Sequence, residues 1–432
     1  MNLRLYRAFM YLARPFARPL LELRRGKGLE SDDPKRRLER LGAPSAPRPD
    51  GTVFWFDALS VGEGNSAMPV IARALEKYPA SHAIVTTTTV TGAENMRKHL
   101  AGRRAIHQFL PLDRRAYVDR FLDHWRPSAG FFVDSNFWPN MLLASRARNI
   151  PLILLNGRIS DTSYARWTRN REDAKMLMRS FVYALAKSDD DAKKLSDMGI
   201  ANVDCVGNLK YGMPPVAHDE GILRELRSAG ARKNWTASVT HEGEEEIILA
   251  AHKKILGQFP GALLIISPRH AERGLRIRDM AAGMGFDTAL ESEAGTTFDG
   301  ADVYISDSFG NLGLYYAYTD IVFVGGSLLP SLRGHNPMES ARLGCAVLSG
   351  PYVDSFLETY DILRREDAVI TVGNAEDLAE HVASLMSSPE KLAELTDMTR
   401  LIAEREAGVI NRAWERISPL LERIVPPTES TS

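Results

Sequence analysis

Short apolar runs alternate with amphipathic stretches along most of the chain. The runs are rich in Val, Ile, Leu and aromatic residues and predict strands at residues 53–56, 83–85, 130–133, 151–155, 182–186, 237–238, 262–266, 303–305, 321–324 and 346–348. Between them, segments of about ten residues repeat apolar positions at helical spacing, as in 67–78, 189–198 and 242–256. This alternation predicts parallel sheets with helices on both faces.

The pattern is interrupted at Pro214-Pro215, because two adjacent prolines continue neither a helix nor a strand. A chain of 432 residues also exceeds the size at which one core usually stops growing. We therefore predict two α/β domains, 51–210 and 220–425, joined by a linker at 211–219 and facing each other across a ligand cleft. The second domain should include the terminal helices, and the tail, 426–432, should be disordered.

Residues 1–50 differ from the rest of the chain in charge. Up to residue 27 they carry six arginines and one lysine against a single acid, Glu22, with apolar side chains interleaved. This composition is typical of a helix on an anionic membrane surface, so we expect residues 1–28 to bind one reversibly and the prolines that follow to form a linker. The longest apolar run, 8–13, is too short for a membrane span or a signal peptide. The alternative is an amphipathic helix packed on its own domain.

The overall charge and the cysteines exclude other classes of function. A net charge of −1 gives no electrostatic basis for binding nucleic acid. Cys205 and Cys345 have no metal-ligand spacing, which suits a reducing compartment. We therefore expect a cytosolic protein that touches the membrane from that side.

A glycine turn follows the predicted strand 321–324. Gly325 and Gly326 end the strand, and a helix is predicted to start near Pro337. The N–H groups and dipole of that helix start would favour a phosphate. Glu339, in the first turn of that helix, would either reach a ribose diol or stabilise its own helix by interacting with the helix dipole.

Glu63 follows another strand and lies between two glycines. We predict that it projects from a loop at the carboxyl edge of the first sheet, where ligands bind in open α/β sheets. Partial burial there would raise its pKa and suit it to take a proton from a sugar hydroxyl. The alternative is an acid that stabilises the start of its own helix.

Further candidate residues follow other strands. Arg269 and His270 end one strand, where an arginine can clamp a phosphate or carboxylate, or else form an ion pair with Glu272. Lys210 ends the last strand of the first half and is expected to face the cleft. His241 begins a run of acids that suits a helix start, and a metal site there is unlikely on spacing grounds because no second histidine lies four residues on.

Together these stretches resemble the Kdo (3-deoxy-D-manno-octulosonic acid) transferase family. Eight strings match in order over nearly the whole chain: 60–63, 86–92, 138–140, 156–160, 207–210, 240–245, 268–270, and 325–327 with 334–339. The resemblance implies a GT-B glycosyltransferase of two Rossmann-like domains. It also implies CMP-Kdo as donor, the lipid A precursor (lipid IVA) as acceptor, inversion at the anomeric carbon, no metal or cofactor, and a peripheral place on the cytoplasmic face of the inner membrane.

The same match assigns roles to individual residues. Glu63 would deprotonate the acceptor hydroxyl. The nucleotide would be bound by one group of residues, with Glu339 on the ribose: Arg269, His270, Ser327, Asn336 and Glu339. The sugar or the acceptor would be bound by another: Lys210, His241, Asn136 and Arg158.

Two departures from the family pattern keep other functions open. Asn136 and Asn311 each stand where the family usually has a glutamate. A paralogue that uses another CMP-activated acidic sugar or another acceptor is therefore an alternative. Less favoured are a sugar-nucleotide epimerase, against which the basic N-terminus argues, and a non-catalytic sugar-binding protein, against which Glu63 and Arg269 argue.

Overall fold

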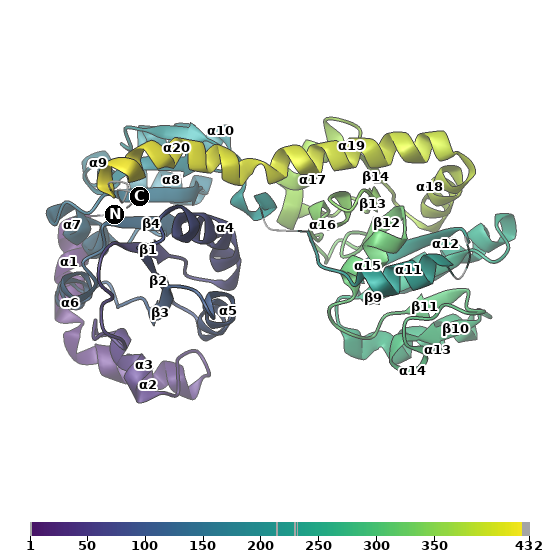
Figure 1. Cartoon of the computed structure of the whole chain (residues 1–432), viewed down its shortest axis with the longest axis horizontal. Helices are drawn as coiled ribbons and strands as arrows, with labels where there is room; N and C mark the ends of the chain where they lie inside the picture. Colours follow the sequence, from purple (N-terminus) through teal and green to yellow (C-terminus); the bar gives the residue numbers. More distant parts are fainter. Residues whose placement is uncertain (1, 213–214, 229, 231, 426–432) are drawn as a thin grey trace, which may run out of the picture. The chain divides into compact units, whose positions relative to one another are not determined.

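The structure is a computed structural model, and it describes residues 2–212, 215–228, 230 and 232–425. The described residues within Met1–Met213 and Glu406–Ser432 form one compact unit, and those within Pro214–Arg405 form the other (Figure 1). Each unit contains one parallel sheet flanked by helices. The prediction of two Rossmann-like α/β domains is therefore confirmed.

The first unit holds seven parallel strands in the order β3-β2-β1-β4-β5-β6-β7. They are β1 (Val53–Asp57), β2 (His82–Thr87), β3 (Ala105–Phe109), β4 (Ala129–Val133), β5 (Leu152–Gly157), β6 (Phe181–Ala186) and β7 (Val203–Cys205). The chain starts in the middle of the sheet, fills one side and then continues on the other. Strands β1, β4 and β5 are buried at every position, as expected for parallel strands covered on both faces.

The helices of this unit begin at recognisable caps. Ser60 and Thr89, for example, accept backbone N–H bonds at the starts of α4 and α5. The helices are α1 (Leu3–Leu12), α2 (Ala17–Gly26), α3 (Pro34–Glu39), α4 (Val61–Lys77), α5 (Val90–Leu100), α6 (Arg115–Trp125), α7 (Pro139–Ala147), α8 (Asp161–Thr168), α9 (Arg171–Met178), α10 (Asp189–Asp197) and α20 (Val409–Ile424).

The second unit also has seven parallel strands, in the order β10-β11-β9-β8-β12-β13-β14. This order differs from that of the first sheet, because β11 lies between β9 and β10. The strands of the second unit are β8 (Asn234–Thr240), β9 (Leu263–Pro268), β10 (Thr288–Leu290), β11 (Val303–Ile305), β12 (Ile321–Val324), β13 (Ala346–Ser349) and β14 (Val369–Thr371). The helices that begin within this unit are α11 (Glu220–Ser228), α12 (Glu245–Gln258), α13 (Gly274–Gly283), α14 (Glu291–Ala294), α15 (Leu312–Tyr318), α16 (Met338–Ala341), α17 (Leu357–Arg364), α18 (Ala375–Ser387) and α19 (Pro389–Ala407).

Buried aromatic side chains anchor the strands that carry the site residues. Trp55 on β1 is fully buried, and its ring centroid lies 5.1 Å from that of Phe121 and 4.9 Å from that of Phe132. Its Nε1 donates to Thr86 Oγ1 (2.9 Å), so its one polar group is satisfied. The position of β1, and of the loop that follows it, is therefore fixed by the core.

Strands β3, β10 and β14 were not predicted, and the last strand of the first half, β7, ends at Cys205 and not at Lys210, which lies in the 3-10 turn Leu209–Gly212. Strand β3 contains two polar residues that find partners inside the unit. His107 Nε2 bonds to Thr87 Oγ1 (3.0 Å), and Gln108 Oε1 accepts from Trp125 Nε1 (2.8 Å). Strands β10 and β14 have three residues each and lie at the edges of their sheet, so neither forms an apolar run that a pattern search can find.

Residues 2–50 are part of the first unit, and the predicted separate anchor and linker is wrong for the part after α2. Glu39 is fully buried and accepts from Phe109 N (2.6 Å). Arg40 is also buried and pairs with Glu30 (3.1 Å). The buried carboxylate of Glu39 binds β3, and the buried ion pair of Arg40 with Glu30 lies within the segment itself. A solvated linker would bury neither.

The second predicted domain, 220–425, ends too late in the structure. Helix α20 belongs to the first unit, where Arg412 Nε donates to Val206 O (3.1 Å) and Ile417 is fully buried. Its apolar periodicity predicts a helix but does not indicate which of the two sheets the helix packs against, so the sequence could not assign it to a unit. Part of the predicted linker and all of the predicted disordered tail, 426–432, lie outside the described residues.

Candidate active site

The predicted site residues follow the strands at which each sheet reverses its order. In the first sheet β1 lies between β2 and β4, and in the second β8 lies between β9 and β12. Ligands of open α/β sheets bind beyond the carboxyl ends of strands at such switch points. Glu63 and Asn136 follow β1 and β4, while His241 and Gly325 follow β8 and β12. Each unit therefore has one candidate half-site, and we describe them separately.

Glu63 lies in the first turn of α4, and the prediction of a loop position is wrong. Ser60 caps this helix and accepts from Glu63 N (3.4 Å), which starts the helix earlier than expected. Glu63 Oε2 accepts two hydrogen bonds, from Leu59 N (2.8 Å) and from Asn136 Nδ2 (2.8 Å). Oε1 has a longer contact with the Ser60 hydroxyl (3.3 Å), so it is the oxygen that a substrate hydroxyl could approach.

The surroundings of Glu63 raise its pKa. Burial is the largest cause, and the neighbouring carboxylate of Asp134 adds to it. The hydrogen bonds from Asn136 and Leu59 favour the charged form and lower the pKa. The balance leaves the pKa above the ordinary value of a glutamate, in the direction that a general base needs.

The other predicted residues of the first unit lie around this carboxylate. Asn136 is buried, and Arg158 Nε pairs with Asp134 Oδ1 (3.0 Å). Lys210 Nζ lies 3.8 Å from the position that a Cβ would take on Gly62, next to Glu63 in sequence. The structure therefore places Asn136 and Lys210 at Glu63 and connects Arg158 to it through Asp134.

Asp57, which ends β1, was missed by sequence reasoning. It is fully buried, and Thr86 Oγ1 donates to its Oδ1 (2.7 Å). Burial raises the pKa of Asp57 well above its ordinary value, and the charge of Glu63 acts in the same direction. The surroundings of Asp57 thus favour its neutral form. Its only signal in the sequence is an acid at the end of an otherwise apolar strand.

In the second unit a buried carboxylate holds the glycine turn. Glu244 is fully buried and accepts four backbone N–H bonds, from His241 (2.9 Å), Gly326 (2.7 Å), Ser327 (2.8 Å) and Leu328 (2.9 Å). It therefore ties the end of β8 to the loop after β12. From the sequence this run of acids is interpreted only as a helix start, because the loop that Glu244 binds is distant in sequence.

The two glycines of the turn are required by close packing. Gly326 has φ +71°, and a Cβ there would stand 2.6 Å from the ring of His335. A Cβ on Gly325 would meet Thr240 Cα at 2.9 Å. The backbone after β12 can therefore approach the end of β8 only with glycine at both positions.

Three histidines and an arginine gather at this turn. His241 Nε2 and His335 Nε2 are 2.8 Å apart in stacked rings, and the ring of His270 lies edge-on to His241 with centroids 6.1 Å apart. Arg269 is exposed beside them. Burial lowers the pKa of His335 to about 4, with His241 and Arg269 contributing, and it also lowers the pKa of His241. This cluster, which we term the histidine cluster, suits an anion because a bound negative charge would offset these repulsions.

The remaining predicted nucleotide residues differ in how they are placed. Ser327 is fully buried, and its hydroxyl donates to Val324 O (2.7 Å) and accepts from Gly350 N (2.8 Å), so its side chain serves the loop itself. Asn336 Oδ1 accepts from Met338 N (3.2 Å), whereas Glu339 is exposed.

The helix expected near Pro337 is α16, which has four residues. The predicted helix start is confirmed, but the helix is shorter than expected, and a phosphate at its N-terminus stays a prediction. Ser340 Oγ bonds to Pro337 O, and the chain turns into β13 soon afterwards. Asn311, the second departure from the family pattern, precedes α15 and donates to the carboxylate of Glu291. Within the part of the chain that the structure describes, no group of three or more His, Cys, Asp or Glu side chains is arranged to hold a metal ion.

Comparison with known proteins decides the family. Residues 35–213 match the family model described as 3-deoxy-D-manno-octulosonic-acid transferase (kdotransferase). A probable mitochondrial 3-deoxy-D-manno-octulosonic acid transferase of Arabidopsis thaliana is 35% identical over 432 residues, covering 96% of this chain and 95% of that protein. The chain belongs to the Kdo transferase family. The Kdo transferase of Haemophilus influenzae is 30% identical over 392 residues, 89% of this chain and 90% of that protein. The protein is therefore a glycosyltransferase, and the motif resemblance is confirmed.

Solved structures of low identity share the fold of this Kdo transferase family member. A UDP-GlcNAc 2-epimerase from Neisseria meningitidis, bound to UDP-GlcNAc, has a TM-score of 0.56 at 14% identity and covers 86% of this chain and 99% of that one. A glycosyltransferase from Rickettsia africae ESF-5 has a TM-score of 0.55 at 12% identity, and the match covers 88% of this chain and 100% of that one. At these identities the likeness concerns the fold alone.

Proposed function

We propose that this protein transfers Kdo from CMP-Kdo to a hydroxyl of the lipid A precursor lipid IVA, with Glu63 as the general base. The observation that carries the proposal is the placement of Glu63: it lies at the switch point of its sheet, with Oε2 held by two donors and Oε1 open to a hydroxyl. Membership of the Kdo transferase family supports the sugar. The acceptor and the donor nucleotide are inferences from that family.

The proposed reaction is a single displacement. Glu63 Oε1 takes the proton of the acceptor hydroxyl, and the acceptor oxygen forms a bond to the anomeric carbon of Kdo. The bond between that carbon and the CMP phosphate oxygen breaks, and the electron pair leaves with CMP. Attack opposite to the leaving group inverts the anomeric carbon.

The leaving phosphate would be stabilised by protein groups, without a metal ion or cofactor. Arg269 and His270 are exposed at the end of β9, beside His241. Fixed donors of this kind can stabilise charge that develops on a leaving group. In this proposal Glu339 and Asn336 bind the ribose side of CMP, while Lys210 and Arg158 offer positive charge to the acidic sugar or the acceptor phosphates.

The test is a transfer assay with CMP-Kdo and a tetraacylated lipid A precursor, read by mass spectrometry. Glu63→Gln should lower transfer by roughly 10²- to 10⁴-fold, the range of a lost general base, while CMP binding persists. Glu76→Gln is the matched control, because Glu76 is exposed on the same helix, α4. Full activity in Glu63→Gln would refute the role of Glu63 as general base. Loss of CMP binding would show that the carboxylate is needed to bind the donor.

A second candidate donor is another CMP-activated acidic sugar. Asn136 and Asn311 motivate it, because each removes a charge that the family pattern places there. Competition assays with CMP-Kdo and other CMP-sugars would separate the two donors. Transfer from CMP-Kdo that exceeds all others by tenfold or more would exclude the second candidate.

We also propose a peripheral location on the cytoplasmic face of the inner membrane. The basic composition of residues 1–28 supports it, as does the need to reach an acceptor that is a lipid. Fractionation at low and high salt tests the attachment, since electrostatic binding should weaken as salt rises.

A further inference from the structure

The N-terminal helices α1 and α2 attach to the first unit by one face. Leu3 and Leu21 are buried, and Tyr6 Oη donates to the buried carboxylate of Asp113 (2.8 Å). Leu3 N also donates to Asp173 Oδ2 (2.9 Å). These contacts give the segment a defined orientation, so its other face presents a defined surface. None of the helices in the described part of the chain is long and apolar enough to cross a bilayer.

The other face of these helices is apolar and open to solvent. Its large side chains are between 45% and 72% exposed: Leu5, Phe9, Tyr11, Leu12, Phe16, Leu20 and Leu23. They make up nearly half of the large exposed apolar side chains among the described residues. Such a concentration on one short segment marks an interaction surface rather than scattered exposure.

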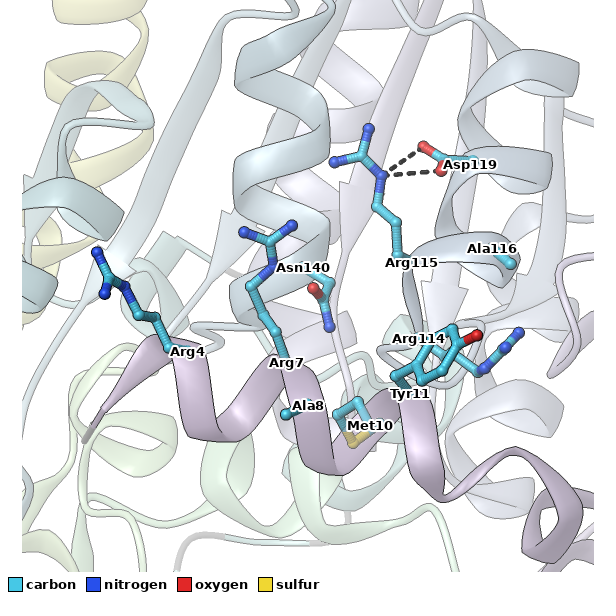
Figure 2. A pocket seen from close by; sticks show the side chains of 10 residues that line it. All are labelled: Arg4, Arg7, Ala8, Met10, Tyr11, Arg114, Arg115, Ala116, Asp119 and Asn140. Atoms are coloured by element: carbon cyan, nitrogen blue, oxygen red, sulfur yellow. Dashed lines mark hydrogen bonds and ion pairs between the residues drawn. The ribbon is translucent and has the colours of Figure 1, made fainter.

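A basic cavity, which we term the arginine pocket, lies between α1 and the start of α6 (Figure 2). It has a volume of about 590 Å³, and four arginines line it: Arg4, Arg7, Arg114 and Arg115. Figure 2 shows Arg4 and Arg7 extending from the same side of α1. Arg115 is paired with Asp119 (2.8 Å), whereas the ion pairs among the described residues do not involve Arg4 or Arg7.

An apolar groove adjoins the arginine pocket. It has a volume of about 420 Å³ and is lined by Phe9, Leu12, Phe16 and other apolar residues of α1 and α2. Met10 and Arg114 line both cavities, so the two share a wall. Arg114 is held there by aromatic rings, with its Cζ 5.0 Å from the ring centroid of Tyr117.

We propose that this face binds one anionic phospholipid of a membrane leaflet, with its phosphate in the arginine pocket and an acyl chain in the apolar groove. The inference rests on the proposed membrane attachment, which it deepens, and not on the sugar that is transferred. Guanidinium groups match phosphate oxygens by paired hydrogen bonds. A free phosphate would use only the pocket, a lipid without a phosphate would leave the arginines without a partner, and a zwitterionic phospholipid would bring its own cation next to them. The adjoining cavities together fit the two parts of one amphiphile.

The lipid site is connected by hydrogen bonds to the segment that leads to the candidate active site. Asn140 lines the arginine pocket, and Asn140 N donates to Asp113 Oδ2 (3.0 Å), the oxygen that also accepts from Tyr6. Asn140 lies at the start of α7, and the β4–α7 connection just before this helix carries Asn136, which bonds to Glu63. Binding a lipid here would therefore hold the β4–α7 connection at the membrane surface.

Vesicle co-sedimentation of the full chain tests the arginine pocket. We expect binding to phosphatidylcholine vesicles that contain phosphatidylglycerol to exceed binding to pure phosphatidylcholine by tenfold or more. The double variant Arg7→Gln with Arg114→Gln should lose most of this preference. The control pair, Arg400→Gln with Arg423→Gln, lies on α19 and α20 and should keep it. Equal binding by the wild type and the pocket variant would overturn the phosphate assignment.

A second variant tests the apolar groove. Leu12→Asp should lower binding to both kinds of vesicle by tenfold or more, while Leu401→Asp, at a similarly exposed leucine of α19, should not. Vesicle binding by Leu12→Asp at the wild-type level would overturn the assignment of an acyl chain to the apolar groove. Saturable binding of inorganic phosphate without vesicle binding would show a soluble-anion site instead.

Transfer to a detergent-solubilised acceptor, measured in the same variants, separates this inference from the proposed function. Activity should persist, because none of the substituted residues bonds to Glu63 or the histidine cluster. If the wild type binds vesicles but transfers no Kdo, the proposed function fails and the lipid site stands.

Discussion

Asn136, which follows β4, contacts Glu63 in the first turn of α4. The family pattern usually has a glutamate at position 136, and two carboxylates at this distance would repel each other and favour a shared proton. An amide instead donates a hydrogen bond to Glu63 Oε2 (2.8 Å). The substitution therefore favours the charged form of Glu63, the form that accepts a proton.

This contact predicts a change in the pH dependence of transfer. The Asn136 hydrogen bond lowers the pKa of Glu63, so Asn136→Ala should raise it, and the acid limb of the pH profile of kcat/KM should move to higher pH. Activity at neutral pH should fall by roughly tenfold, the effect of losing a hydrogen bond to a charged group. Asn202→Ala, which loses a surface hydrogen bond to Val182 O, is the control. An unchanged acid limb in Asn136→Ala would show that another group titrates.

At the scale of elements, the ends of β8 and β12 act together. Glu244, at the start of α12, binds the backbone after both strands, and the glycines after β12 leave room for His335 against His241. The result is a set of cationic and titratable groups, His241, His270, His335 and Arg269, facing one another at a switch point. Burial is the main reason why His241 and His335 resist protonation, and a bound anion would favour their charged forms and pair with Arg269.

We predict that nucleotide binding at the histidine cluster takes up a proton. The pKa of free His335 is lowered to about 4, and a bound phosphate would raise it, so the protonated form is favoured in the complex. Affinity for CMP should therefore weaken as the pH rises through the pKa of the complex, and titration calorimetry in buffers of different ionisation enthalpy should detect proton uptake.

The control for this measurement is His335→Asn, because CMP itself also titrates. The phosphate of CMP gains a second proton near pH 6, and this contribution is common to both proteins. The difference between the wild type and His335→Asn is therefore the part due to the protein. Identical proton uptake in the two proteins would contradict the prediction.

At the scale of the whole molecule, the first unit depends on both ends of the chain. The N-terminal helices and α20 belong to it together with the β1–β7 sheet, whereas the second unit is one continuous stretch. The described residues near both ends of the chain, from residue 2 and up to residue 425, therefore belong to the same unit. Folding of the first unit needs contacts between α4 and α20, which are more than 330 positions apart in sequence, and this raises the entropic cost of folding the unit.

This organisation predicts that a core change in α20 destabilises the first unit selectively. Ile417 is fully buried, and Ile417→Ala should lower the free energy of unfolding of that unit by about 2–5 kcal/mol. CMP binding by the second unit should persist at temperatures where the first has unfolded. Calorimetry and CMP titration check this, with Leu401→Ala, 61% exposed on α19, as control. Simultaneous loss of both units would show that they unfold as one.

Individual site residues could be predicted from the sequence to different degrees. Arg269 and His241 were selected because they directly follow strands, and Glu63 because it lies within a few residues of the end of β1; a strand end is visible in the pattern. Glu244 and Asp57 were missed, since their importance comes from burial against partners far away in the chain. Ser327 was selected for its place in a motif, but its hydroxyl is used by the loop.

The sequence by itself determined the alternation of strands and helices, the division into two α/β halves and the family, because apolar periodicity and short motifs are local properties. Only the tertiary structure decided the strand order, the pairing of Asn136 with Glu63 and the unit to which α20 belongs. These depend on which distant segments pack together. The N-terminal segment illustrates both: its basic and apolar composition is visible in the sequence, but only packing against Asp113 and Asp173 decides which face is left open to solvent.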